Sequence, residues 1–122
     1  MNYDFPQILA SYPHLIERID ILRQEIKPQE SHYSVIFLLA HSKKLIMRDY
    51  YFTDGRRKYS FHVQDAANNL VFRYDNEPHW ADLPNFPFHK HLPDSVVPSP
   101  EMTLEMVLDE LEIMLSVEKK PK

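Results

Sequence analysis

The sequence of 122 residues has no cysteine and a single glycine, Gly55, beside ten prolines. Without cysteine the chain forms no disulfide bond and offers no thiolate to a metal ion. With one glycine it has no glycine-rich phosphate loop of the P-loop or Rossmann kind. The sequence therefore excludes the nucleotide-binding enzymes that depend on those loops.

Long apolar runs are missing as well. No segment approaches the roughly 18 apolar residues that span a membrane, and the chain opens with no basic-then-apolar secretory signal. We therefore expect a cytoplasmic protein with no membrane partner. The formal net charge of −4 argues against a general nucleic-acid coat protein, but it is compatible with a local basic patch.

The length and the ordinary apolar content predict one domain over residues 1–122. A chain of this size buries roughly two thirds of its unfolded surface around a single core. The predicted fold class is α+β. We expect an antiparallel meander sheet of four or five strands, packed by an N-terminal helix and a C-terminal amphipathic helix.

Two segments are predicted to be helices. In residues 4–11, Asp4 can cap the first turn, and Pro6 is tolerated there because first-turn N–H groups have no helical partner. In residues 103–117, apolar residues recur with helical spacing on one face: Leu104, Val107, Leu108, Leu111 and Leu115. Residues 15–26 fit a helix loosely and also fit a strand, and periodicity alone leaves both open.

Four segments rich in β-branched and aromatic residues are predicted to be strands: 33–41, 44–52, 57–65 and 69–75. Asp54 and Gly55 lie between the second and the third of them. This pair is a strong hairpin signal, because glycine tolerates the positive φ that such turns need. The four strands should therefore follow one another as an antiparallel meander.

Alternation along the last two strands predicts their register. A connection over residues 66–69 places Asp65 opposite Leu70, Val63 opposite Phe72, Phe61 opposite Tyr74 and His62 opposite Arg73. The predicted core face then carries Tyr59, Phe61, Val63, Leu70, Phe72 and Tyr74. The predicted polar face carries Lys58, Ser60, His62, Gln64, Arg73 and Asp75.

Residues 76–98 contain five prolines and three large aromatic residues, Trp80, Phe86 and Phe88. We expect a long loop without secondary structure of its own, which the aromatic side chains anchor onto the sheet. Loops of this length are more often functional or disordered than idle, and the aromatic residues argue against disorder.

The C-terminal helix is also predicted to carry a second apolar stripe, nearly opposite the first. Its members are Met106, Ile113 and Val117. They are either incidental surface residues or a surface for a partner or a second copy of the chain. The sequence leaves both interpretations open.

Four motifs follow one another over the second half of the chain: Tyr59–Asp65, Phe72–His79, Phe86–His91 and Pro98–Leu111. In this order and spacing, residues 57–113 resemble the TumE family of toxins from type II toxin–antitoxin modules. The chain departs from the family pattern in its last hairpin, where Ala67-Asn68-Asn69 replaces an Asp-Gly turn, and at Trp80, where a second histidine is common.

The resemblance implies a growth-inhibiting protein that is neutralised by a small cognate antitoxin encoded beside it. Such antitoxins often carry a helix-turn-helix DNA-binding domain. The resemblance also implies that residues 16–26 are a strand that begins the sheet. It implies no particular reaction, so the chemistry has to be argued from the residues.

The polar residues of this region support three interpretations. In the first, His89 and His91 bind a metal ion together with His79 or Asp75, since alternate residues of an extended chain point to the same side. No HExxH motif supports it. In the second, His62 and Arg73 carry out metal-independent cleavage of RNA, or another transfer of phosphate, as acid/base and as cation. In the third, these side chains only stabilise the fold.

The second interpretation predicts an active site in which His62, Arg73 and Asp75 have catalytic roles. The residues assigned to substrate binding are Lys58, Gln64, His79, His89, Lys90 and His91. We assign no metal ligand and expect no cofactor. The competing function is a non-catalytic protein-binding module. The expected partners are the antitoxin, RNA, and a second copy bound through Met106, Ile113 and Val117.

Overall fold

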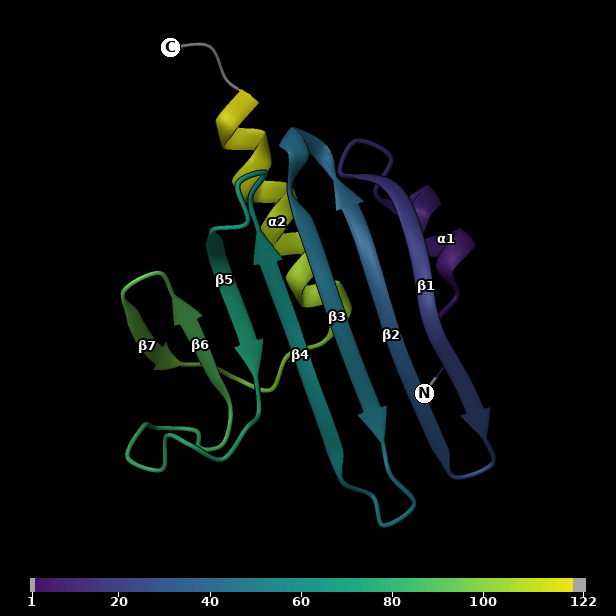
Figure 1. Ribbon diagram of the computed structural model, residues 1–122, viewed down its shortest axis with the longest axis vertical. Coiled ribbons are helices and arrows are strands. Elements are labelled where there is room, and N and C mark those ends of the chain that lie inside the picture. The colour runs from purple at the N-terminus through teal and green to yellow at the C-terminus, as the bar shows by residue number, and fades with distance from the viewer. Residues whose placement is uncertain (1, 120–122) are drawn as a thin grey trace.

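The computed structural model describes residues 2–119, without the side chains of residues 117–119, and consists of one antiparallel sheet with two α-helices on one face (Figure 1). The chain runs through α1 (Phe5–Ser11), β1 (Ile16–Lys27), β2 (Glu30–Leu39), β3 (Lys44–Tyr51), β4 (Arg57–Gln64), β5 (Leu70–Asp75), β6 (His89–Leu92), β7 (Ser95–Pro98) and α2 (Leu104–Lys119). A 3-10 turn over Ala40–Ser42 joins β2 to β3. The α+β fold class and both predicted helices are confirmed.

The described part of the sheet has seven strands in the order β1 to β7, so each strand pairs with its neighbour in the chain. The prediction of four or five strands is wrong for two reasons. Residues 15–26, for which periodicity allows a helix or a strand, form most of β1, as the family resemblance implies. Residues 76–98 are not a plain loop, because their second half forms the hairpin of β6 and β7.

These two strands span four residues each, which is too short for alternation to be visible in the sequence. Pro98 is tolerated because β7 is an edge strand and donates no further ladder hydrogen bond there.

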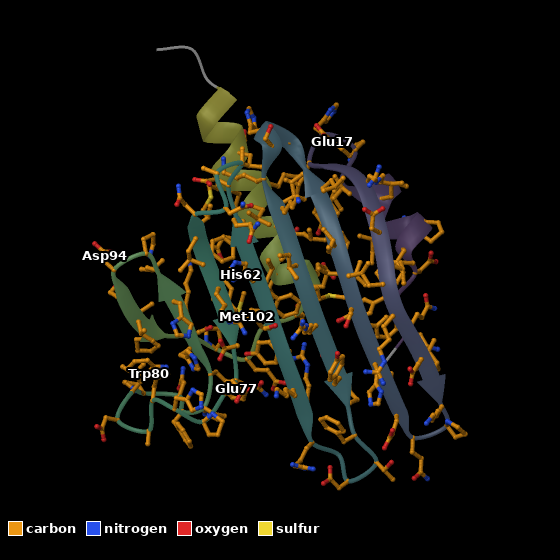
Figure 2. The ribbon with its side chains drawn as sticks, in the orientation of Figure 1. Glu17, His62, Glu77, Trp80, Asp94 and Met102 are labelled. Carbon is orange, nitrogen blue, oxygen red and sulfur yellow. The ribbon has the colours of Figure 1, made fainter. Side chains whose placement is uncertain are left out.

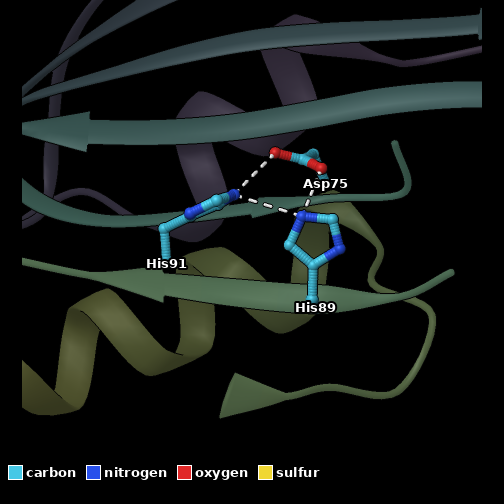
Figure 3. Close-up of side chains that lie close together, drawn as sticks. All are labelled: Asp75, His89 and His91. Carbon is cyan, nitrogen blue, oxygen red and sulfur yellow. Dashed lines mark hydrogen bonds and ion pairs between the residues drawn. The ribbon is translucent and has the colours of Figure 1, made fainter. Parts of the chain in front are cut away.

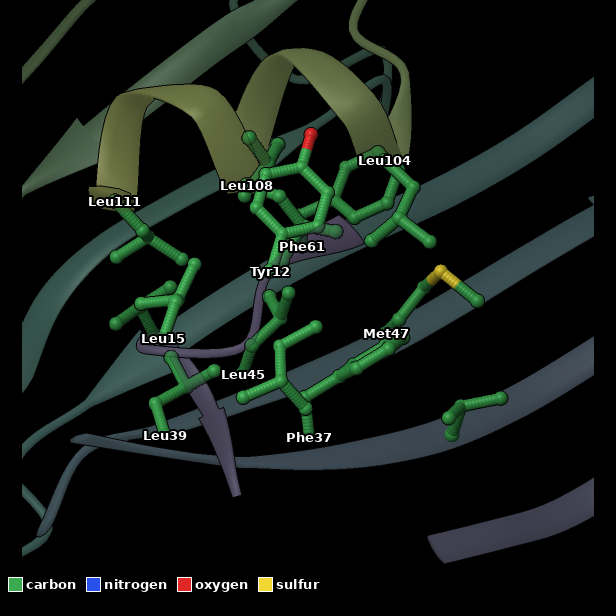
Figure 4. Close-up of a cluster of buried hydrophobic side chains, with 14 of the residues drawn as sticks. Tyr12, Leu15, Phe37, Leu39, Leu45, Met47, Phe61, Leu104, Leu108 and Leu111 are labelled. Carbon is green, nitrogen blue, oxygen red and sulfur yellow. The ribbon is translucent and has the colours of Figure 1, made fainter. Parts of the chain in front are cut away.

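The core lies between the sheet and the two helices (Figure 4). All five residues of the predicted α2 stripe are buried. They pack against alternate residues of the central strands, among them Phe37, Leu45, Met47 and Phe61. At the other helix, the side chain of Asp4 accepts a hydrogen bond from the backbone N–H of Gln7, as the sequence predicts for a cap.

The register of β4 and β5 matches the prediction for His62, Phe61 and Val63, which lie opposite Arg73, Tyr74 and Phe72. The last pair differs, since Gln64 and not Asp65 lies opposite Leu70. The extra residue, Val71, forms a β-bulge.

Asp65 lies in the turn after β4, where its carboxylate accepts the backbone N–H groups of Ala67 and Asn69, both at 2.9 Å, and its own N–H donates to the carbonyl of Asn69 at 3.0 Å. The bulge exchanges the faces of two side chains. Val71 packs against the core, while Leu70 turns to the polar face. The assignment of Leu70 to the core face is therefore wrong.

A buried ion pair that the sequence did not suggest joins β3 to β4. Asp49 is fully buried, and Arg57 reaches its two oxygens through Nε at 2.8 Å and Nη2 at 3.0 Å. The guanidinium also donates to the carbonyl of Met102 at 2.8 Å and lies 4.2 Å from the ring centre of Tyr59. The hydroxyl of Tyr3 donates to the same carboxylate. This network ties the N-terminal segment and the approach to α2 onto the sheet.

No helix among residues 2–119 is long and apolar enough to cross a membrane.

Candidate functional site

The face of the sheet away from the helices carries two rows of polar residues across β4, β5 and β6 (Figure 2). In the first row His62 lies opposite Arg73, which lies opposite His91. In the second row Ser60 lies opposite Asp75, which lies opposite His89. The β6–β7 hairpin therefore brings two histidines beside the predicted pair of His62 and Arg73.

The first row lines a shallow hollow of about 520 Å³. His62, Arg73 and His91 form its polar side. Leu70 and the turn of the hairpin, residues 92–96, form the rest. Figure 2 shows His62 on β4 and Asp94 on that turn. The bulge at Val71 contributes to this hollow, because it turns Leu70 toward it.

His62 is held in its neutral form near neutral pH. Burial lowers its pKa, and the positive charge of Arg73 lowers it further, while a hydrogen bond with Gln64 acts in the opposite direction. Its Nδ1 atom is buried and has no hydrogen-bond partner among the described residues. A neutral imidazole beside a guanidinium is suited to accept a proton next to a group that can neutralise an anion.

Asp75 and His89 of the second row form one cluster with His91 of the first row (Figure 3). Nε2 of His89 lies 2.8 Å from Oδ1 of Asp75 and 3.1 Å from Nε2 of His91. Nε2 of His91 lies 3.5 Å from Oδ2 of Asp75. Asp75 and His89 are almost completely buried, while the His91 side chain is 27% exposed.

Two neighbouring residues orient the carboxylate of this cluster, and a third residue, Trp80, packs against its histidines. Nε of Arg73 donates to Oδ2 of Asp75 at 2.8 Å, and the backbone N–H of Glu77 donates to Oδ1 at 3.0 Å. The indole ring of Trp80 meets both imidazoles edge-on, with ring centres 6.4 and 6.2 Å apart. Arg73 thus links the two rows, because it lines the hollow and also bonds to Asp75.

The other predicted site residues lie outside this cluster and outside the hollow. Lys90 points to the opposite, helix-covered face, where its ammonium lies 2.8 Å from Glu110. Lys58 is exposed and pairs with Glu77 at 3.1 Å. The side chain of Gln64 donates to that of Asn68 at 2.9 Å.

His79 is exposed in the loop before the hairpin. It lies outside the group whose ligand atoms converge.

Sequence reasoning did not anticipate the contact of Trp80 with the histidines or the contribution of residues 92–96 to the hollow. Both depend on the β6–β7 hairpin. The alternate spacing of His89 and His91 was the one signal for it, and it correctly indicated that both side chains point to the same side.

The family model described as Toxin TumE matches residues 6–115, nearly the whole chain and more than the residues that carry the resemblance. No curated protein and no solved structure matches the chain.

Proposed function

Because this chain belongs to the TumE toxin family, and so corresponds to the toxin component of a toxin–antitoxin system, we propose that it acts on RNA through His62 and Arg73. The observation that carries the proposal is the hollow on the polar face. It is lined by an imidazole whose pKa is lowered and by a guanidinium that faces it across the strand pair.

Metal-independent cleavage of RNA uses a base and a cation close to each other, as His62 and Arg73 are here. The 2′-hydroxyl attacks the adjacent phosphorus, and neutral His62 accepts its proton, while the bond to the 5′-oxygen breaks and that oxygen takes a proton from solvent or a second acid. Arg73 neutralises the charge on the phosphate oxygens, to which a guanidinium can donate two hydrogen bonds at once. Because DNA lacks the 2′-hydroxyl, this reaction would cleave RNA and not DNA.

Asp75 is 3% exposed and does not line the hollow. Its contribution to the proposed reaction is therefore to position Arg73 through their 2.8 Å bond. Lys58 and Gln64 lie on the same face of β4 and are proposed to hold the flanking RNA strand.

The test is growth of bacteria that carry the gene under a tight inducible promoter. We expect arrest and fragmentation of cellular RNA with the wild type, and neither with the double variant His62→Ala/Arg73→Ala. Arg48→Ala is a matched control, because Arg48 lies opposite Ser60 on the same face but outside the hollow. Arrest with the double variant at equal protein levels would contradict the proposal.

A second candidate function, a non-catalytic protein-binding module, is favoured by the outer face of α2. Met106 and Ile113 are 40% and 69% exposed there, while the side chain of Val117 lies outside the described residues. We propose that this stripe binds a partner, which is the cognate antitoxin with its helix-turn-helix domain or a second copy of this chain.

Sedimentation of wild type and Met106→Glu/Ile113→Glu, each alone and with the antitoxin, tests this surface. Loss of association in the variant supports it. Unchanged association with both partners would leave the stripe as ordinary surface. Growth arrest that persists in His62→Ala/Arg73→Ala but disappears in the helix variant would favour the binding module over the ribonuclease.

A further inference from the structure

The cluster of Asp75, His89 and His91 has the dimensions of a metal site. The three shortest separations between its donor atoms are 2.8, 3.1 and 3.5 Å, of which the first is to Oδ1 of Asp75 and the last to Oδ2. With one donor atom taken from each residue, all three atoms lie within 4.8 Å of one another. Ligand atoms at about 2.0–2.1 Å from a tetrahedral ion lie roughly 3.3 Å from one another. The three separations lie on both sides of this value.

The hydrogen bonding of His89 shows why a cation is needed. Its Nδ1 lies 2.9 Å from the carbonyl oxygen of Pro87, which can only accept, so Nδ1 carries a proton. In the neutral ring, Nε2 then presents a lone pair toward a carboxylate oxygen of Asp75 and toward Nε2 of His91. Two electron-rich groups therefore meet in a nearly buried space, and Nε2 of His91 adds a third in the tautomer that carries its proton on Nδ1. A metal ion or a proton between Nε2 of His89 and the carboxylate oxygen relieves their repulsion.

The surroundings match those of a metal ligand set. A histidine ligand typically donates its other ring N–H to a backbone carbonyl or carboxylate, and ligating carboxylates are themselves hydrogen-bonded. His89 has the first of these contacts through Pro87, and Asp75 has the second through Arg73 and the N–H of Glu77. Trp80 shields the imidazoles at one side.

We propose that Asp75, His89 and His91 bind a divalent transition-metal ion, with zinc as the representative. Two imidazoles and one carboxylate are ligands that zinc and iron(II) accept, and they are too few in oxygen for calcium or magnesium. Three protein ligands leave a position for water or a substrate oxygen. His91 lines the hollow as well as the cluster, so this position is reached from the side of the proposed RNA site.

The experiment measures metal binding by the full chain, made by cell-free synthesis without a histidine tag and dialysed against a chelator. Zinc is titrated calorimetrically, bound metal is counted after gel filtration, and cobalt is used as a spectroscopic probe of coordination. The ligand variant is His91→Ala, whose partly exposed side chain can be removed with little disturbance of the fold. The matched control is His79→Ala, which removes an exposed histidine of the loop before the hairpin.

We expect one zinc ion per chain, a higher melting temperature with zinc, and the visible absorption band of four-coordinate cobalt. In His91→Ala the affinity should fall by more than the roughly 10–100-fold that removal of an outer-shell partner costs, while His79→Ala binds as the wild type does. Asp75→Asn, which keeps the size of the side chain, should also weaken binding.

Two outcomes would overturn the site. One is a folded wild type, shown by circular dichroism, that binds neither metal, in which case hydrogen bonds alone hold the cluster together. The other is metal binding that His91→Ala and His79→Ala weaken equally.

The metal site can be tested separately from the proposed RNA cleavage. If His62→Ala loses RNA degradation but still binds zinc, both proposals stand. If the wild type binds zinc but does not degrade RNA, only the proposed function is removed.

Discussion

At the scale of single residues, the buried pair of Asp49 and Arg57 should dominate stability. Arg57 keeps 7% of its side chain exposed, so removing its partner leaves a charge with little access to water. We expect Asp49→Ala to lower the free energy of unfolding by about 3–5 kcal/mol, the usual cost of breaking a buried ion pair from one side. Urea denaturation measures it.

The exposed pair of Arg18 and Asp20 is the control for this prediction. Its nitrogen–oxygen distance is 2.9 Å, close to the 2.8 Å of the buried pair, but the two side chains are 67% and 37% exposed. Asp20→Ala should therefore change the stability by at most about 1 kcal/mol. Equal effects of the two substitutions would show that burial of Arg57 does not govern the cost.

His62 should make the stability depend on pH. Burial and the charge of Arg73 lower its pKa below the ordinary histidine value of 6.5, so the folded state favours the neutral ring. The unfolded chain then binds more protons below about pH 6.5, and stability falls as the pH drops through the folded pKa. Gln64 on the same strand, Ile46 opposite on β3 and Arg73 on β5 are the groups that surround it.

Urea denaturation of wild type and His62→Gln between pH 8 and pH 5 checks this prediction. The wild type should lose more stability than the variant on acidification, and the difference should develop below about pH 6.5. Two curves that stay parallel over the whole range would contradict the lowered pKa.

At the scale of elements, the contact of β6 with α2 should hold the hairpin in place. Lys90 and Tyr74 both bond to Glu110, at 2.8 and 2.5 Å. We expect Glu110→Ala to cost about 1–2 kcal/mol, since charged hydrogen bonds of partly buried groups are worth somewhat more than neutral ones. Hydrogen exchange of the amides in residues 89–92 should become faster.

Glu112→Ala is the matched control, because Glu112 lies on the exposed side of the same helix. It removes the same charge from α2 without touching the hairpin. If the amide hydrogens of β6 exchanged at the wild-type rate in both variants, the position of the hairpin would be set by its pairing with β5 alone.

The elements also show what the sequence could predict. Long periodic segments such as the α2 stripe were found correctly, because burial on one face imposes a repeat over many residues. The β6–β7 hairpin was missed, since four residues give no repeat and the pairing depends on a distant partner. The bulge at Val71 was missed because alternation assumes an unbroken ladder, and no residue pattern marks the register shift between Val63 and Gln64.

The candidate site was predicted in the same uneven way. His62 and Arg73 were placed opposite each other from alternation alone, and the register confirms it. The neighbourhood of Asp75 and the two β6 histidines could not be derived, because it requires knowing that β6 lies next to β5. Ion pairs such as Asp49 with Arg57 carry no periodic signal at all.

At the scale of the whole molecule, the single core predicts one cooperative unit. Buried residues from α1, the central strands and α2 form one cluster among the described residues. Trp80, the one tryptophan, lies outside this core beside the β6 histidines, so its fluorescence reports on the far edge of the sheet. We expect its unfolding transition in urea to coincide with that of far-ultraviolet circular dichroism. An earlier fluorescence transition would show that the hairpin region unfolds separately.

The strict succession of the strands, each beside its neighbour in the chain, fixes the order in which the parts of the protein become available on the ribosome. The five strands from β1 to β5 emerge after α1, and each strand from β2 onward finds its preceding partner already synthesised. The histidines of β6 follow, and α2, which covers the core, comes last. A chain that stops before β6 has neither histidine, so an incomplete translation product cannot assemble the polar cluster.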